Sequence, residues 1–171
     1  MLKKHKNSGF SVIELLAVVV IMAILATGTI TIVLSISSYR AKQAVEEISA
    51  TMSETRVQAL SKTSAWMEIR QESDGTYMIG TSYAGDTRLA NSYTISYTRE
   101  GDATEVPIQT SNPLVLTYDR STGGFADIKI KDPSGNLTGT GTYCDSITVS
   151  KGSKTFVIRL YKESGKHKFE D

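Results

Sequence analysis

The sequence predicts an α+β protein in which a long N-terminal helix packs on an antiparallel β-sheet or β-sandwich head. Residues 10–34 contain a single charged residue, Glu14, and an apolar stripe at helical spacing follows them. From residue 65 onward, short segments of alternating character are separated by Gly-containing turns, a pattern typical of antiparallel strands. The length of 171 residues leaves room for one ordinary domain and an anchoring segment.

Residues 1–9 form a short basic segment that we interpret as a leader, since it contains three lysines and no acidic residue. Residues 10–34 are long enough to span a bilayer, because about 20 apolar residues at ~1.5 Å per residue cover the hydrocarbon core. Basic residues before an apolar span favour a cytoplasmic N-terminus. The sequence therefore predicts a single-pass protein of the cytoplasmic (inner) membrane, with its N-terminus inside and its β domain outside.

Hydropathy alone favours an uncleaved signal anchor, but two residues favour cleavage of the leader. Gly9 lies between the basic segment and the apolar helix, where an unbranched residue lets a protease bind the chain in an extended form. Glu14 is a carboxylate in an apolar span, and a charge at mid-bilayer costs about 2.5–3.5 kcal/mol. A cut after Gly9 would give Phe10 a positive amine that can pair with the Glu14 carboxylate of a neighbouring subunit. Breaking such a buried pair costs about 3–5 kcal/mol, so the pair would set the axial register between subunits.

These residues also carry a family resemblance. Residues 9–16, GFSVIELL, resemble the processing motif of type IV prepilins and type II secretion pseudopilins. The resemblance implies cleavage between Gly9 and Phe10 by a prepilin peptidase, N-methylation of the Phe10 amine, and a role for Glu14 in docking into a growing filament. It also implies other pilins or pseudopilins as partners, together with an inner-membrane assembly platform and its ATPase. It implies no cofactor.

Residues 35–64 are predicted to continue the helix as an amphipathic half, so that one helix runs from about residue 11 to about residue 62. An apolar stripe at helical spacing indicates packing against the protein's own β domain. The residues of the stripe are Ala41, Val45, Ile48, Met52 and Ala59.

The membrane half of the predicted helix contains no proline, unlike that of many pilins, but it contains Thr27, Gly28 and Thr29. Glycine and β-branched residues weaken a helix locally, so this segment is one candidate for melting or stretching inside a filament. The other interpretation is that Gly28 allows two membrane helices to pack closely. The sequence leaves both open.

Residues 65–171 are expected to form an antiparallel β domain. Asp74-Gly75 is a strong signal for a hairpin with a two-residue turn. The weakest order is expected at 82–92, 100–113 and 132–142, which are polar or rich in Gly and Thr. The expected strands are 66–72, 76–81, 93–99, 114–118, 126–131, 146–149 and 155–161.

The C-terminal part of the chain resembles the closing hairpin of GspH/FimT-type minor pseudopilins. The resemblance rests on the alternation in 145–149 and 156–160 and on the glycines between strands. Some members of that group have a C-terminal cysteine pair, whereas this chain has only Cys144. A single cysteine excludes an internal disulfide, and we expect Cys144 to be a small buried or half-buried residue.

The sequence contains no hydrolase elbow, phosphate loop or metal-binding spacing, so we expect neither an enzyme nor a metal site. Four basic residues near the C-terminus, Lys151, Lys154, Arg159 and Lys166, suggest a DNA-contacting edge. The simpler interpretation is that they form a solvated face. We also expect Arg159 to point outward from its strand.

The resulting prediction is a minor pilin or pseudopilin, a structural subunit of a type IV pilus-like filament. The alternative is a DNA- or surface-binding tip subunit that acts through the β domain. The sequence does not distinguish type II secretion from DNA uptake (competence), adhesion or motility.

Overall fold

The computed structural model describes residues 11–61, 64–89 and 93–170; the side chains of residues 26–38 lie outside this description. The chain divides into two compact units, one that ends at Ile36 and one that begins at Ser37. Helix α1 spans Val12–Ser61, close to the expected bounds, and contributes to both units. The rest of the second unit is built of antiparallel strands, so the α+β class is confirmed.

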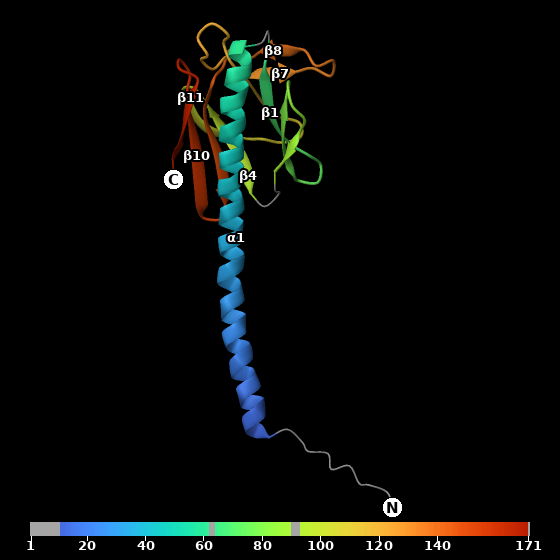
Figure 1. The fold of residues 1–171 in the computed structure, drawn as a ribbon, viewed down its shortest axis with the longest axis vertical. Coiled ribbons are helices and arrows are strands. Elements are labelled where there is room, and N and C mark those ends of the chain that lie inside the picture. The colour runs from blue at the N-terminus through green and yellow to red at the C-terminus, as the bar shows by residue number, and fades with distance from the viewer. Residues whose placement is uncertain (1–10, 62–63, 90–92, 171) are drawn as a thin grey trace, which may run out of the picture. The chain divides into compact units, whose positions relative to one another are not determined.

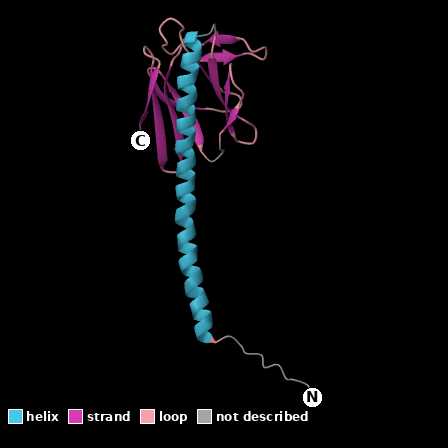
Figure 2. Cartoon of the chain, in the orientation of Figure 1, coloured by secondary structure: helices cyan, strands magenta, loops and turns pink. Residues whose placement is uncertain are grey.

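Two antiparallel sheets make up most of the second unit (Figures 1 and 2). The six-stranded sheet has the order β3-β2-β1-β6-β7-β8 and the five-stranded sheet the order β11-β10-β9-β4-β5. The strands are β1 Trp66–Gln71, β2 Tyr77–Thr81, β3 Thr87–Arg88, β4 Thr94–Arg99, β5 Asp102–Pro107, β6 Leu114–Thr117, β7 Lys129–Lys131, β8 Leu137–Gly139, β9 Cys144–Lys151, β10 Lys154–Tyr161 and β11 Lys166–Glu170.

The part of α1 that belongs to the second unit packs on both sheets (Figure 1). Every residue of the predicted apolar stripe is buried, and Ile48 and Met52 are completely inaccessible to solvent. They share one core with Ile69 and Leu116 of the six-stranded sheet and with the inner side chains of the five-stranded sheet. The prediction that the stripe packs against the protein's own β domain is confirmed.

Polar contacts fix the helix along this core. The Tyr118 hydroxyl donates to the carbonyl of Met52 over 2.9 Å, and the Arg56 Nε donates to the carbonyl of Gly123 over 2.9 Å. The Ser49 hydroxyl lies 2.6 Å from Nε2 of His167 on β11. These bonds tie three turns of the helix to the residue after β6, to the loop that follows it and to β11.

The hairpin at Asp74-Gly75 is confirmed, but its loop is one residue longer than expected. The Glu72 amide donates to the Thr76 carbonyl over 2.8 Å, which leaves residues 73–75 as the loop. Gly75 has a φ of 80°, the left-handed conformation of the last residue in a three-residue hairpin loop.

Four strands were not predicted, and three of them lie in the regions expected to be the least ordered. β3, β5 and β8 fall within 82–92, 100–113 and 132–142, and β11 follows the last expected strand. β3, β5, β8 and β11 are the outer strands of the two sheets, and the residues of β5 are almost all exposed. An outer strand needs only one hydrogen-bonding neighbour and can lack a buried face, so its sequence lacks the apolar alternation on which the prediction relied.

The expected strand at 126–131 is wrong over its first half. Only Lys129–Lys131 forms β7, because the preceding residues bond in an irregular way. The Ala126 amide donates to the Thr117 carbonyl over 3.0 Å, and the Ile128 amide donates to the Thr142 carbonyl over 2.7 Å. Ala126 thus bonds to the segment that ends β6, whereas Ile128 bonds to the segment after β8, and neither set of bonds continues as a regular ladder through residues 126–128.

Gly165 lies where the turn after β10 meets the loop after β6. Its φ is 61°, and a Cβ atom at this position would lie 1.8 Å from the carbonyl oxygen of Gly123. Gly152, in the turn between β9 and β10, has a φ of 60° but no atom within 4 Å of the same added Cβ. The two glycines therefore share a backbone conformation and differ in the space around them.

We expect Gly165→Ala to lower the free energy of unfolding by about 3 kcal/mol or more, because it adds a backbone clash to the left-handed strain. The matched variant Gly152→Ala should lower it by only about 1–2 kcal/mol, the cost of the left-handed conformation alone. Thermal and denaturant unfolding of the full chain in detergent measures both. Equal losses would contradict the clash.

The stability of the second unit should fall as the pH drops below about 6.5, the ordinary pKa of histidine. Burial lowers the pKa of His167, whose Nδ1 has no hydrogen-bond partner among the described residues. The folded state therefore favours the neutral ring. The stabilisation that the neutral His167 ring provides is complete above the pKa of the unfolded state. It is lost as the pH falls through the pKa of the folded state.

Unfolding measured between about pH 7.5 and about pH 5.5 tests this effect, since few carboxyl groups titrate in that window. A His167→Gln variant keeps a group that can bond to Ser49 but does not titrate. It should lose less stability across the window than the unmodified chain. An identical loss in both proteins would assign the effect to other groups.

Candidate functional site

Ser11 and Glu14 form a closed hydrogen-bonded arrangement at the start of α1. The Ser11 amide donates to Oε2 of Glu14 over 2.9 Å, and the Ser11 hydroxyl lies 3.0 Å from the same oxygen. In return, the Glu14 amide donates to the Ser11 hydroxyl over 3.3 Å. Ser11 precedes the first helical residue, so the pair is a capping box, in which a serine and a glutamate three residues later satisfy each other's backbone amides.

The capping box gives Glu14 a local role in addition to the predicted contact between subunits. It satisfies two amides that would otherwise lack partners at the helix start, and it places a negative charge at the positive end of the helix dipole. All of the described bonds to the carboxylate use Oε2, so Oε1 remains available to a further donor. The S-x-x-E spacing was visible in the sequence and is the signal that would have identified Ser11.

The helix that follows is covered with exposed apolar side chains. Large apolar residues on all of its sides are 48–86% exposed, from Val12 through Met22. A helix that is apolar all round is stable only when lipid or other protein covers it. These exposed apolar residues are Val12, Ile13, Leu15, Leu16, Val18, Val19, Val20, Ile21 and Met22.

Within the residues that the structure describes, no helix is both long and apolar enough to cross a membrane.

Two sets of predicted site residues lie partly or wholly outside the described part of the chain. Gly9 and Phe10 are not among the described residues. The backbone of Thr27, Gly28 and Thr29 is helical, but their side chains lie outside the description. Cleavage at Gly9, methylation of Phe10 and stretching at residues 27–29 therefore stay predictions.

The four basic residues near the C-terminus do not form one patch. Lys151 and Lys154 lie opposite each other at one end of the β9–β10 ladder. Lys166 pairs with Tyr161 at the other end of β10. Tyr161 follows Lys154 by seven residues along this strand, which is about 23 Å at ~3.3 Å per residue. Arg159 lies between them and is exposed as expected, but its guanidinium is 3.4 Å from Asp145 and 3.5 Å from Glu170.

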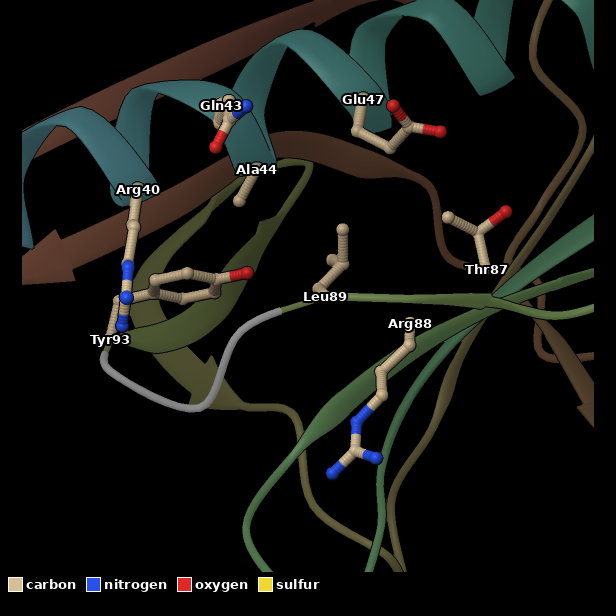
Figure 3. Close-up of a pocket in the computed structure, with 8 residues that line it drawn as sticks. All are labelled: Arg40, Gln43, Ala44, Glu47, Thr87, Arg88, Leu89 and Tyr93. Atoms are coloured by element: carbon tan, nitrogen blue, oxygen red, sulfur yellow. The ribbon is translucent and has the colours of Figure 1, made fainter.

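A shallow pocket of about 290 Å³ lies between α1 and the segment around β3 (Figure 3). Ala44 and Leu89 are buried at its floor, while Arg40, Glu47 and Arg88 are exposed around it. The sequence gives no sign of this pocket, because its two walls are at least 40 residues apart in the chain.

Cys144 is buried, as predicted, and burial raises the pKa of its thiol, so that little reactive thiolate forms at neutral pH. Among residues 11–61, 64–89 and 93–170, no three His, Cys, Asp or Glu side chains are grouped to hold a metal ion.

Ser11→Ala should remove the cap and destabilise the first turn of α1 by about 1 kcal/mol, the usual cost of losing an N-cap. Ser11→Thr keeps a capping hydroxyl and should restore most of the loss. Amide hydrogen exchange of residues 12–16 in detergent reports this directly, with residues 48–52 of the same helix as an internal control. Unchanged exchange in Ser11→Ala would contradict the capping role.

Comparison with known proteins agrees with the site at the start of the helix. Residues 4–30 match the family model described as the prokaryotic N-terminal methylation motif. No curated protein and no solved structure shows significant similarity to the chain. The family described by this motif is structural rather than enzymatic, and the motif implies association with other pilins. The match at residues 4–30 thus supports a type IV pilin-like protein.

Proposed function

We propose that this chain is a minor pilin or pseudopilin, made as a membrane-anchored precursor and assembled into a type IV pilus-like filament. The observation that carries the proposal is the methylation motif at residues 4–30. In this proposal the peptidase cuts between Gly9 and Phe10, the new Phe10 amine is methylated, and residues 10–34 are stored in the inner membrane. An assembly platform and its ATPase then move the subunit into the filament.

The exposed apolar side chains of residues 12–22 support membrane storage followed by filament packing. Both lipid and a bundle of neighbouring helices would cover them, and each buried side chain gains roughly 1.5–3 kcal/mol over its exposed state. Because lipid tails are as apolar as these side chains, apolar burial alone would not distinguish one axial position from another. A polar contact is needed to set the register.

The arrangement of Glu14 suits that contact. Its Oε2 is engaged by Ser11 of the same chain, while Oε1 has no described donor. The capping bonds lower the cost of holding a carboxylate near the membrane, since a charge that is already hydrogen-bonded loses less on leaving water. The free oxygen would then accept the Phe10 amine of a neighbouring subunit. Ser11 thus binds one carboxylate oxygen of Glu14, and the amine of the neighbouring subunit would bind the other.

A GspH/FimT-type head agrees with a helix that packs on two antiparallel sheets, and we propose it as the subtype. A DNA- or surface-binding tip subunit is the alternative. The ion pairs of Arg159 with Asp145 and Glu170 weaken the alternative at that residue. The separation of Lys166 from Lys154 weakens it further, because a continuous edge of phosphate contacts is missing.

Intact mass of the membrane-extracted protein tests processing. Coexpression with a prepilin peptidase should yield a chain that begins at Phe10 and carries one additional methyl group. Gly9→Val should leave the chain at its full length, because a branched residue at the cut hinders extended binding. A chain that still begins at Met1 beside an active peptidase would contradict the proposal.

Glu14→Gln tests the register contact separately. The variant should be cut and stored normally, but should enter filaments at least 100-fold less, since about 3–5 kcal/mol of pairing is lost. Filament incorporation is measured by shearing and quantitative immunoblotting, with the membrane pool as the reference. Normal incorporation would exclude the Phe10–Glu14 pair while leaving cleavage intact.

A further inference from the structure

Lys151 and Lys154 lie directly opposite each other where the β9–β10 hairpin closes. The turn between them contains Gly152 and Ser153. Like charges in this position repel and destabilise a hairpin. Neither lysine forms an ion pair with any described residue that would offset this repulsion. Folding alone therefore gives no reason for this pair.

The closed end of the β9–β10 hairpin, which we call the tip, lies at the same end of the second unit as the start of the helix in that unit. Ser150, next to Lys151, pairs with Thr94 at the beginning of β4. Tyr93, which precedes Thr94, lines the pocket that Arg40 of α1 also lines (Figure 3). In Figure 1 the β9–β10 turn accordingly lies at the end of the sheets where this part of α1 begins.

This end of the second unit has an excess of unpaired positive charge. Arg40 and Lys42 are exposed and, like the two tip lysines, have no ion pair among the described residues. The acidic residues of the nearby β1–β2 hairpin are already engaged, Glu72 by Arg70 at 2.9 Å and Asp74 by Arg88 at 3.2 Å. Glu46 and Glu47 follow on α1, one to two turns farther from Ser37.

The covalent chain limits how far this end can lie from a membrane that holds residues 10–34. Tyr39 follows residue 34 by five positions, which span at most about 18 Å even when fully extended. Tyr39 is 64% exposed, and tyrosine beside arginine and lysine is the composition that proteins place at the headgroup level. The unpaired cations thus belong to the end of the second unit that is tethered to the bilayer surface.

We propose that Lys151 and Lys154, together with Arg40 and Lys42, bind anionic phospholipid headgroups on the outer surface of the membrane that anchors the chain. We call these four residues the basic foot. The inference rests on the proposed membrane anchoring of residues 10–34. Lipid contact explains the facing lysines, because an anionic surface removes the repulsion between them. The tether also keeps the foot near the lipid, so that weak contacts suffice. The contact would hold the head on the membrane before the subunit leaves for the filament.

The test uses the processed full chain in nanodiscs of phosphatidylcholine, with or without an equal amount of phosphatidylglycerol. An environment-sensitive fluorophore on a Ser153→Cys variant reports whether the hairpin tip lies among headgroups, and the chain with Ser153 intact controls for labelling of the buried Cys144. Phosphatidylglycerol should shift the signal to the docked state, and salt at about 1 M should reverse it, because the Debye length falls to ~3 Å.

Lys151→Gln/Lys154→Gln should reduce the ratio of docked to free tip by roughly 25-fold, since each lysine near an anionic surface contributes about fivefold. The matched variant Lys166→Gln/Lys168→Gln changes the same charge elsewhere on the same sheet and should leave the ratio unchanged. Thermal unfolding checks the fold of both. The tip variant should be at least as stable as the unmodified chain, because it removes the repulsion.

Three outcomes would overturn the inference: no effect of phosphatidylglycerol, an equal loss in both variants, or capture of the tip by duplex DNA in place of phosphatidylglycerol. Co-migration of the chain with phosphatidylcholine nanodiscs, scored separately, tests anchoring itself. A chain that fails to co-migrate contradicts the proposed function. A chain that co-migrates but has an insensitive tip contradicts only the basic foot.

Discussion

Ile48 and Met52 lie where α1 meets both sheets, and their complete burial is the constraint on which the second unit depends. The inner faces of the two sheets contribute Ile69, Leu116 and Ile147 to the same core, so the helix closes a space that the sheets alone would leave open to water. The bonds from Tyr118 to Met52 and from Ser49 to His167 secure the helix on each side. The β domain and the second part of α1 therefore form one cooperative unit, and the helix is a structural part of the head.

The two parts of α1 differ in which apolar side chains they expose, because different partners cover them. From Val12 to Met22 apolar residues lie on every side and are exposed, whereas from Ala41 to Ala59 they form one buried stripe. The first pattern requires lipid or neighbouring helices, and the second is satisfied within the chain. The capping box of Ser11 and Glu14 is the only polar feature among residues 11–16. It is therefore the natural place for a specific contact in a segment whose other contacts are not directional.

Charges in the second unit also fall into two groups. Arg70, Arg88, Arg159 and Lys162 are held in ion pairs with neighbouring acids, as is usual for a solvated surface. Arg40, Lys42 and the facing lysines of the β9–β10 tip have no such pairs among the described residues and lie at one end of the unit. This division separates Arg159 from the lysines with which the sequence had grouped it. Lys151 and Lys154 thus belong to the tip of one hairpin and not to a long basic edge.

The sequence by itself determined the features that depend on local pattern. The motif around Gly9 and Glu14 is contiguous, the stripe from Ala41 to Ala59 follows the helical period, and the strands with a buried face alternate. Tertiary structure decided what depends on partners distant in the chain. The outer strands β3, β5, β8 and β11 form because a neighbouring strand offers hydrogen bonds, without any apolar alternation of their own. The pairing of Arg159 with Asp145 and Glu170, and the meeting of Arg40 with Tyr93 around one pocket, likewise required folding, since no spacing rule links residues on separate elements.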